Sequence, residues 1–157
     1  MKSFKDFIME NDDNSKLVGP FYHRTTADIN KLSDFDISKA SKNSVLGPAL
    51  YASLEGGSWN PGHLKNGKTL KGHVRGHVID LTQPQPQEHL DKLSNLLGKK
   101  VDVPPFTTLE KRFGSVAEGL RQARFSAAIH EGPGKAGRHI AVFDMSKVVD
   151  HGQDKKD

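Results

Sequence analysis

Gly19-Pro20-Phe21-Tyr22-His23-Arg24-Thr25-Thr26 decides how the fold of this chain is interpreted. Two aromatic residues precede a single histidine, and a cation and two hydroxyl side chains follow it. Aromatic residues favour β-strands, and clusters of polar residues end them. The stretch therefore predicts a short strand that presents His23 at its end. The imidazole of His23 either borders a binding site or only satisfies a backbone carbonyl near a turn.

Length and composition predict one loop-rich domain. The chain has 157 residues, of which 27% are charged, 15 are Gly and 8 are Pro. Because it contains no cysteine, it has neither a disulfide framework nor a thiolate metal site. The net charge of +4 fits an anionic partner such as nucleic acid, a dinucleotide or an acidic protein face. No apolar run approaches the roughly 20 residues that span a membrane, so no membrane partner is predicted.

The first ten residues predict a short amphipathic helix. Phe4, Phe7 and Ile8 are spaced to share one helical face. Residues 11–18 are mostly polar and predict a flexible linker. An isolated helix this short is marginal in water, so we expect it to dock on a partner. In the alternative interpretation it packs on the domain as an ordinary N-terminal helix.

This decapeptide resembles the capsid-targeting propeptides of internal head proteins of large contractile-tailed phages. Those propeptides begin Met-Lys, continue with an aromatic-acid-Phe-Ile core and end in Glu. In that family the prohead maturation protease cuts after Ile or Leu, any residue, then Glu, and Ile8-Met9-Glu10 matches this motif. The resemblance implies that residues 1–10 bind the prohead scaffold and the maturation protease, and that the chain is cut between Glu10 and Asn11. It also places the protein in the capsid interior of the virion and later in the host cytoplasm.

The rest of the chain predicts alternating short strands and helices, hence an α+β fold. A second strand over residues 47–53 carries Tyr51, whose alternative role is that of a core aromatic with its hydroxyl hydrogen-bonded at the rim. The polar segment 31–43 predicts a loop over a pocket, and the tail from residue 151 is expected to be disordered. Further patterns predict helices over residues 26–32, 87–97 and 115–124, strands over 69–81, 125–130 and 139–144, and an extended segment over 101–107.

The histidines of the predicted long strand do not predict a metal site. His73 and His77 share a face of this strand, but their backbone positions are about 13 Å apart, too far for a shared ion. A solvated sheet face explains them better, and no metal ion is predicted.

Three of these segments resemble the motifs of the ADP-ribosyltransferase superfamily, in its His-Tyr-Glu branch. The first motif is an aromatic residue, His, Gly and Ser or Thr; Tyr22-His23-Arg24-Thr25 matches it with Arg in the Gly place. The second is Gly-x-Gly-Ile-Tyr-Phe and a small or polar residue; Gly47-Pro48-Ala49-Leu50-Tyr51-Ala52-Ser53 matches its spacing. The third is Glu-x-Ile-Val-x-Asp-x-x-Gln-Ile; residues 139–148 follow it, with His139 in place of the glutamate. The resemblance implies an ADP-ribosyltransferase-like split β-sheet core with a few short helices over residues 19–150.

The resemblance also implies a site for NAD, which is the substrate of this family. His23 would donate to the adenine-side ribose hydroxyl, the backbone of Arg24 would hold the nicotinamide carboxamide, and Tyr51 would stack on the nicotinamide ring. Thr25 and Ser53 occupy the remaining polar positions of the first two motifs.

The third motif carries the chemistry. After nicotinamide leaves, an oxocarbenium-like centre develops, and a nearby carboxylate stabilises its positive charge. A neutral imidazole at His139 can hydrogen-bond the ribose 2-hydroxyl but supplies no negative charge. Glu131, in the predicted loop before this strand, either folds back to serve as the carboxylate or is an exposed loop acid.

The leading functional hypothesis is a phage internal head protein that is ejected with the DNA and mono-ADP-ribosylates a host protein target. The alternative is a non-catalytic internal protein of the same fold that binds and blocks a host defence protein or DNA. Arg24 and His139, which depart from the family motifs, favour the alternative.

Overall fold

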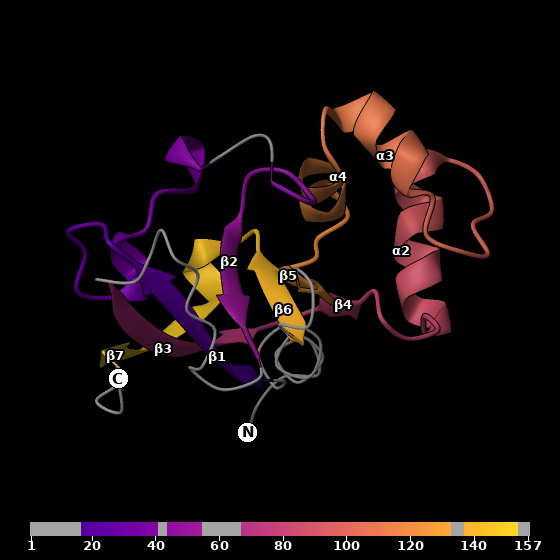
Figure 1. The fold of residues 1–157 in the computed structure, drawn as a ribbon. Coiled ribbons are helices and arrows are strands. Elements are labelled where there is room, and N and C mark those ends of the chain that lie inside the picture. The colour runs from indigo at the N-terminus through magenta and orange to yellow at the C-terminus, as the bar shows by residue number, and fades with distance from the viewer. Residues whose placement is uncertain (1–16, 41–43, 55–66, 133–136, 154–157) are drawn as a thin grey trace, which may run out of the picture.

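The computed structural model describes residues 17–40, 44–54, 67–132 and 137–153, and these residues form an α+β fold. One mixed sheet of seven strands has the order β4-β5-β6-β2-β1-β3-β7 (Figure 1). The predicted α+β class is therefore confirmed. The propeptide over residues 1–10, the cleavage point between Glu10 and Asn11, and most of the predicted linker lie outside the described residues.

The elements follow one another closely along the chain. The strands are β1 (Leu17–Thr25), β2 (Leu50–Ser53), β3 (Lys68–Arg75), β4 (Val78–Asp80), β5 (Ala127–Glu131), β6 (Arg138–Val142) and β7 (Val148–Gln153). The helices are α2 (Gln87–Leu97), α3 (Phe106–Phe113) and α4 (Val116–Gln122), with short 3₁₀ turns η2 (Leu32–Asp34), η3 (Ile37–Lys39) and η5 (Met145–Lys147). None of the described helices is long and apolar enough to cross a membrane.

The strand predicted around His23 is β1, in the interior of the sheet between β2 and β3. Its pairing with β3 shifts register between Val18 and Phe21, where Pro20 has no N–H to donate. The strand begins at Leu17, inside the predicted linker, and β7 extends to Gln153, inside the predicted disordered tail. The start of β1 and the end of β7 both pair with β3. The folded part of the chain therefore extends beyond the predicted domain bounds, residues 19–150.

The prediction of a single long strand over residues 69–81 is wrong, because two strands form there. Leu70, Gly72 and Val74 are buried as the alternation predicts, but the chain breaks at Gly76, where φ is +95°. A positive φ favours glycine, and here it changes the direction of the chain. Beyond the break Ile79 is buried instead of Val78. As a result β4 leaves β3 and pairs in parallel with β5 at the far edge of the sheet.

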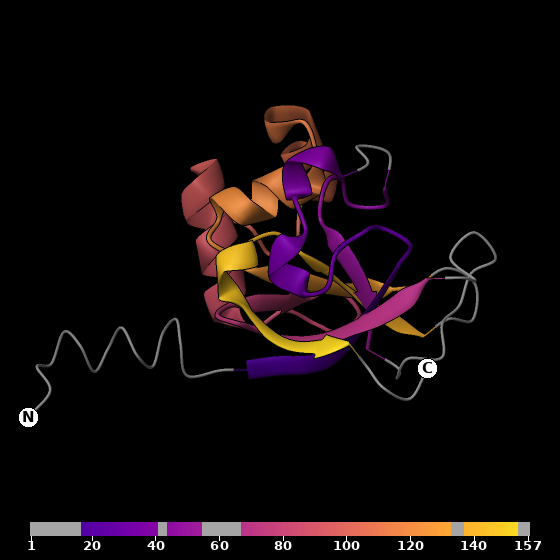
Figure 2. The same ribbon diagram turned by 90° about the vertical axis from the view of Figure 1, so that its left-hand side faces the viewer.

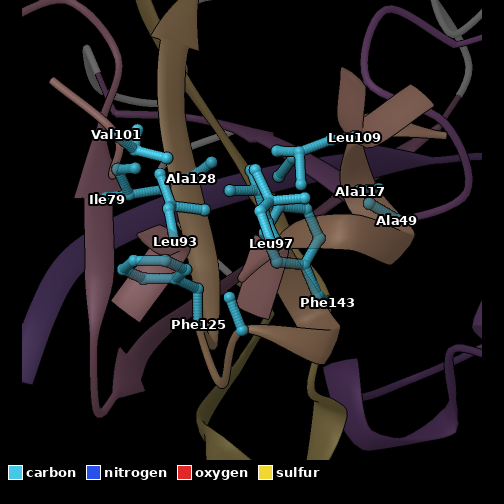
Figure 3. Close-up of a cluster of buried hydrophobic side chains, with 13 residues drawn as sticks. Ala49, Ile79, Leu93, Leu97, Val101, Leu109, Ala117, Phe125, Ala128 and Phe143 are labelled. Carbon is cyan, nitrogen blue, oxygen red and sulfur yellow. The ribbon is translucent and has the colours of Figure 1, made fainter. Parts of the chain in front are cut away.

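Two hydrophobic clusters cover different parts of the sheet. The first lies between the helices and β2, β4, β5 and β6; it includes Leu93 of α2, Leu109 of α3 and Phe143 (Figure 3). The second joins Phe21 of β1 and Leu70 of β3 to Leu32 of η2. Figure 2 shows β1, β3 and β7 side by side. Fully burying one such side chain contributes roughly 1.5–3 kcal/mol to stability.

Successive residues of the central strands alternate between these clusters. Along β2, Leu50 and Ala52 belong to the second cluster, whereas Tyr51 packs against the first. Along β6, Ile140 belongs to the second cluster and Ala141 to the first. The two clusters therefore lie on opposite faces of β2 and β6, as the period of a strand requires.

The helix predicted over residues 26–32 does not form. The Thr25 hydroxyl accepts a hydrogen bond from the backbone N–H of Ala27 at 3.0 Å, and this local turn competes with a helix. The 3₁₀ turns η2 and η3 follow instead. Helix α3 also differs from the prediction, because the segment after Pro104-Pro105 is helical from Phe106, where an extended segment was expected.

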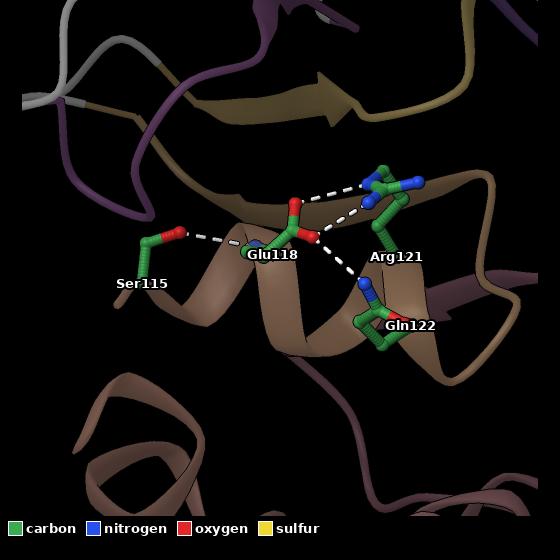
Figure 4. A network of polar contacts seen from close by, with 4 residues as sticks. All are labelled: Ser115, Glu118, Arg121 and Gln122. Carbon is green, nitrogen blue, oxygen red and sulfur yellow. Dashed lines mark hydrogen bonds and ion pairs between the residues drawn. The ribbon is translucent and has the colours of Figure 1, made fainter. Parts of the chain in front are cut away.

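Helices α2 and α4 confirm the predicted elements. Gly98 ends α2 with φ +69°, in the left-handed conformation that suits glycine. The Ser115 hydroxyl caps α4 by accepting the N–H of Glu118 at 3.0 Å (Figure 4). The Glu118 carboxylate does not bond back to the backbone N–H of Ser115, as it would in a capping box. It accepts instead from Arg121 and Gln122.

Candidate functional site

The strands that carry the three predicted motifs are neighbours in the sheet. Their order is β6, β2, β1, so His139, Tyr51 and His23 come from three adjacent strands. Strands β1 and β2 share a single register pair, Tyr22 opposite Ser53. Next to this pair, the imidazole of His23 contacts the backbone of β2: its Nδ1 lies 2.7 Å from the carbonyl oxygen of Tyr51.

This contact fixes the tautomer of His23. A carbonyl oxygen only accepts hydrogen bonds, so Nδ1 must carry the proton and Nε2 must be an acceptor. Burial lowers the pKa of His23 below its ordinary value of 6.5, which keeps the ring neutral near pH 7. The geometry is the one expected if His23 satisfies a backbone carbonyl. It still leaves Nε2 able to accept a bond from a ligand.

His23 and Tyr51 point to opposite faces of the sheet. The His23 ring packs edge-to-face on Phe35, which belongs to the side of the second cluster, with ring centroids 5.4 Å apart. Tyr51 packs against the first cluster. The Tyr51 side chain is therefore on the helix side, and its ring is not beside the imidazole of His23.

Both the hydroxyl and the ring of Tyr51 make contacts that hold the side chain in place. Its hydroxyl donates to the carbonyl of Gly47 at 2.6 Å and accepts the N–H of Leu46 at 3.1 Å. Burial raises the pKa of this hydroxyl. The ring meets the imidazole of His130 edge-to-face, with centroids 5.7 Å apart. This is the rim-anchored aromatic that the alternative interpretation of Tyr51 describes.

A second histidine that sequence reasoning missed stands beside His139. His130 of β5 lies opposite His139 of β6, and Ser53 of β2 lies opposite His139 on the other side. Directly opposite residues share a face, so these three buried side chains and Tyr51 form one polar row on the helix side. His130 is the last residue of the strand predicted over residues 125–130, and His23 was likewise expected near the end of its strand; this position was the signal that could have identified His130.

Both imidazoles of this row have a pKa below the ordinary value of histidine, which favours their neutral form near pH 7. Burial lowers the pKa of His130, and burial together with the nearby His130 lowers that of His139. Nδ1 of His130 donates to the carbonyl of Glu131 at 2.9 Å, so its Nε2 is an acceptor. This Nε2 is buried and has no hydrogen-bond partner among the residues that the structure describes. A buried acceptor of this kind is suited to receive an N–H or O–H group.

Glu131 does not lie beside His139 as a carboxylate. It is the last residue of β5, where a loop was predicted, and it is exposed opposite Arg138. Because successive residues alternate between faces, its side chain points away from the face of His130 and His139. The described part of the chain thus brings no carboxylate from β5 to the polar row.

Arg24 and Thr25 make local contacts. The Arg24 guanidinium donates to the hydroxyl of Thr69 on β3 at 3.0 Å. The Thr25 side chain is buried and holds the turn at Ala27. These contacts do not bring the side chain of Arg24 or Thr25 toward Tyr51 or His139.

A cleft of about 750 Å³ lies elsewhere, beside the C-terminal end of α4. Part of the segment 31–43, predicted to cover a pocket, lines this cleft together with Arg121, Arg124 and Lys147. Asp34, Asp36 and Asp144 line it too, so its charges balance. Arg121 is already bound to Glu118 (Figure 4). The lining includes none of the predicted site residues.

Comparison with models of protein families, with curated proteins and with solved structures finds no match to this chain.

Proposed function

We propose that this chain is an internal head protein of a contractile-tailed phage whose domain mono-ADP-ribosylates a host component with NAD as substrate. The observation that carries the proposal is the contact between His23 and the carbonyl of Tyr51, which joins the first motif to the second on adjacent strands. The third motif lies on the next strand, β6. Three motifs that are far apart in sequence thus lie on adjacent strands of the sheet.

The tautomer of His23 supports a role as hydrogen-bond acceptor in the proposed binding of a ribose. Nε2 accepts a bond from a ribose hydroxyl, the reverse of the donation expected from sequence. Nε2 of His130 accepts a second ligand group, for which the carboxamide N–H of nicotinamide is suitable. Since both rings are neutral, binding requires no change in protonation near pH 7.

The opposite directions of His23 and Tyr51 constrain how a dinucleotide binds. A ligand that contacts both side chains has to reach both faces of the sheet. It can do so only where β1 and β2 are no longer paired, beyond the pair formed by Tyr22 and Ser53. The ladder is interrupted at this point because the imidazole of His23 bonds the Tyr51 carbonyl. The proposal therefore places the scissile glycosidic bond near the Tyr51 end of β2.

The second candidate is a non-catalytic protein of the same architecture that binds a host defence protein. The favouring observation is electrostatic: the polar row of Tyr51, Ser53, His130 and His139 contains neutral groups, and Glu131 points away from it. Without a carboxylate, an oxocarbenium-like centre would lack its counter-charge. DNA is the less favoured partner, because acids are interspersed with most cations of the sequence.

Transfer of labelled ADP-ribose from NAD to proteins of a bacterial host lysate tests the proposal. Residues 11–157 are compared with His23→Ala, Tyr51→Ala, Glu131→Ala and His139→Ala, and with His151→Ala as an exposed histidine control. Labelling that is lost with Tyr51→Ala and kept with His151→Ala supports the transferase. No labelling by a folded protein that also fails to bind NAD favours the binding protein.

The propeptide proposal has its own test. The intact mass of the protein from purified particles is expected to correspond to residues 11–157. A full-length mass would contradict cleavage between Glu10 and Asn11 while leaving the proposed transferase activity untouched.

A further inference from the structure

His77, Glu88 and His89 come together at a place that sequence spacing does not reveal. His77 lies in the break between β3 and β4, and Glu88 and His89 belong to the first turn of α2 (Figure 1). One potential ligand atom from each side chain lies within 4.8 Å of the others. The three residues therefore converge from two separate segments of the described chain.

We propose that these three residues bind one divalent transition-metal ion, with Zn²⁺ the ion that the donor set fits best. Two imidazoles and one carboxylate are a recognised zinc ligand set, which leaves a fourth position for water. Tetrahedral bonds of 2.0–2.2 Å place ligand atoms about 3.4 Å apart, so the group must contract on binding. Glu88 is exposed and can make this adjustment, whereas His89 is buried and fixed.

Phe125 and Ser126 position both histidines. The Phe125 ring packs edge-to-face on His89, with centroids 5.1 Å apart and the planes at 88°. The next residue, Ser126, donates its backbone N–H to the carbonyl of His77 at 2.8 Å. One dipeptide thus restrains the ring of one histidine and the backbone of the other.

Some charges near His77, Glu88 and His89 favour the binding of a cation, and others disfavour it. Glu88 Oε1 lies 3.7 Å from Nε2 of His89 and supplies a negative charge. The N-terminus of α2 carries a partial positive charge, and Lys92 lies 5.6 Å from the Phe125 ring centroid. Both positive charges disfavour the binding of a cation at this place. The ion would link the break between β3 and β4 to α2, so zinc is expected to stabilise the fold.

Titration of the metal-free, untagged full chain with Zn²⁺ in a calorimeter tests this site. One equivalent is expected to bind at pH 7.5, and Glu88→Gln and His77→Gln are each expected to weaken binding at least tenfold. Glu110→Gln, an exposed acid on α3, is the matched control and should leave binding unchanged. Glu88→Gln removes only a charge from an exposed side chain, so its fold is expected to be intact.

The contact between His73 and His151, 2.8 Å between ring nitrogens, is the rival explanation for any zinc bound. The double variant His73→Gln/His151→Gln is expected to keep the zinc affinity of the unsubstituted chain. The proposal is overturned if this double variant loses binding while Glu88→Gln does not, or if the unsubstituted chain binds no Zn²⁺. A rise in melting temperature with Zn²⁺ that is absent in Glu88→Gln would support it further.

Discussion

His130 and His139 face each other across β5 and β6, with ring centroids 6.0 Å apart and the planes at 69°. Both are almost completely buried, and both have a pKa below the ordinary histidine value. Two charged imidazoles at this distance would repel each other without a described carboxylate on their face to compensate. Double protonation of the pair is therefore unfavourable in the folded state, and the lowered pKa values make stability depend on pH.

Stability is expected to fall as the pH is lowered from 7.5 to 5. The folded pKa values of His23, His130 and His139 lie below the ordinary value of 6.5. Between the two pKa values the unfolded chain binds more protons than the folded chain, so the free energy of unfolding rises with pH across this window. Urea unfolding at several pH values measures the slope. The double variant His130→Gln/His139→Gln should flatten it, and an equal slope in this variant would contradict the assignment.

Gly132 packs directly on His139, so Gly132→Ala is expected to destabilise the protein. A Cβ at this position would lie 2.6 Å from Cδ2 of His139 and 2.7 Å from the carbonyl oxygen of Gly137. The cost of such overpacking is about 1–3 kcal/mol. Gly98→Asn is a suitable control, because nothing lies within 4 Å of a Cβ there and Asn tolerates its φ of +69°. Urea midpoints that fall equally for both variants would exclude steric contact as the cause.

The Ser115 cap of α4 is expected to contribute more to the stability of the protein than the ion pair between Glu118 and Arg121. Ser115→Ala leaves the N–H of Glu118 without its acceptor and should cost about 1 kcal/mol. Arg121→Gln breaks the pair with Glu118, in which both side chains are substantially exposed, and should cost well under about 1 kcal/mol. Thermal unfolding of the two variants at 0.15 M salt ranks the two contributions. The reverse ranking would contradict this account.

Sequence patterns found the elements whose signals are local. The helices predicted over residues 87–97 and 115–124 have Gly98 and Ser115 directly at their ends, and the aromatic residues of β1 lie within the strand that they predict. The break at Gly76 was missed because the alternation from Leu70 to Val78 continues through it in sequence. Only the backbone conformation of the glycine changes which residues are buried.

The candidate site was harder to predict than the fold. His23, Tyr51 and His139 were predicted on strands and lie on them, whereas Glu131 was predicted in a loop and ends β5. The direction of each side chain depends on register, which local sequence does not specify. The partner of His23 is a backbone carbonyl 28 residues away, and backbone groups have no sequence signature. His130 was missed as a member of the polar row because its relation to His139 arises only when β5 pairs with β6.

Tyr51→Phe separates the structural role of Tyr51 from its proposed role in NAD binding. Loss of the hydroxyl leaves the N–H of Leu46 and the carbonyl of Gly47 without their partner, which should cost about 1–2 kcal/mol. The ring remains, so a stacking contact with nicotinamide would survive and NAD affinity should change little. Tyr51→Ala removes the ring as well and should abolish measurable NAD binding. Tyr22→Phe, at the other tyrosine of the chain, is the control for stability. If Tyr51→Phe and Tyr51→Ala weaken NAD binding equally, or neither changes it, the stacking role is excluded and Tyr51 is an anchor of the turn at residues 46–47.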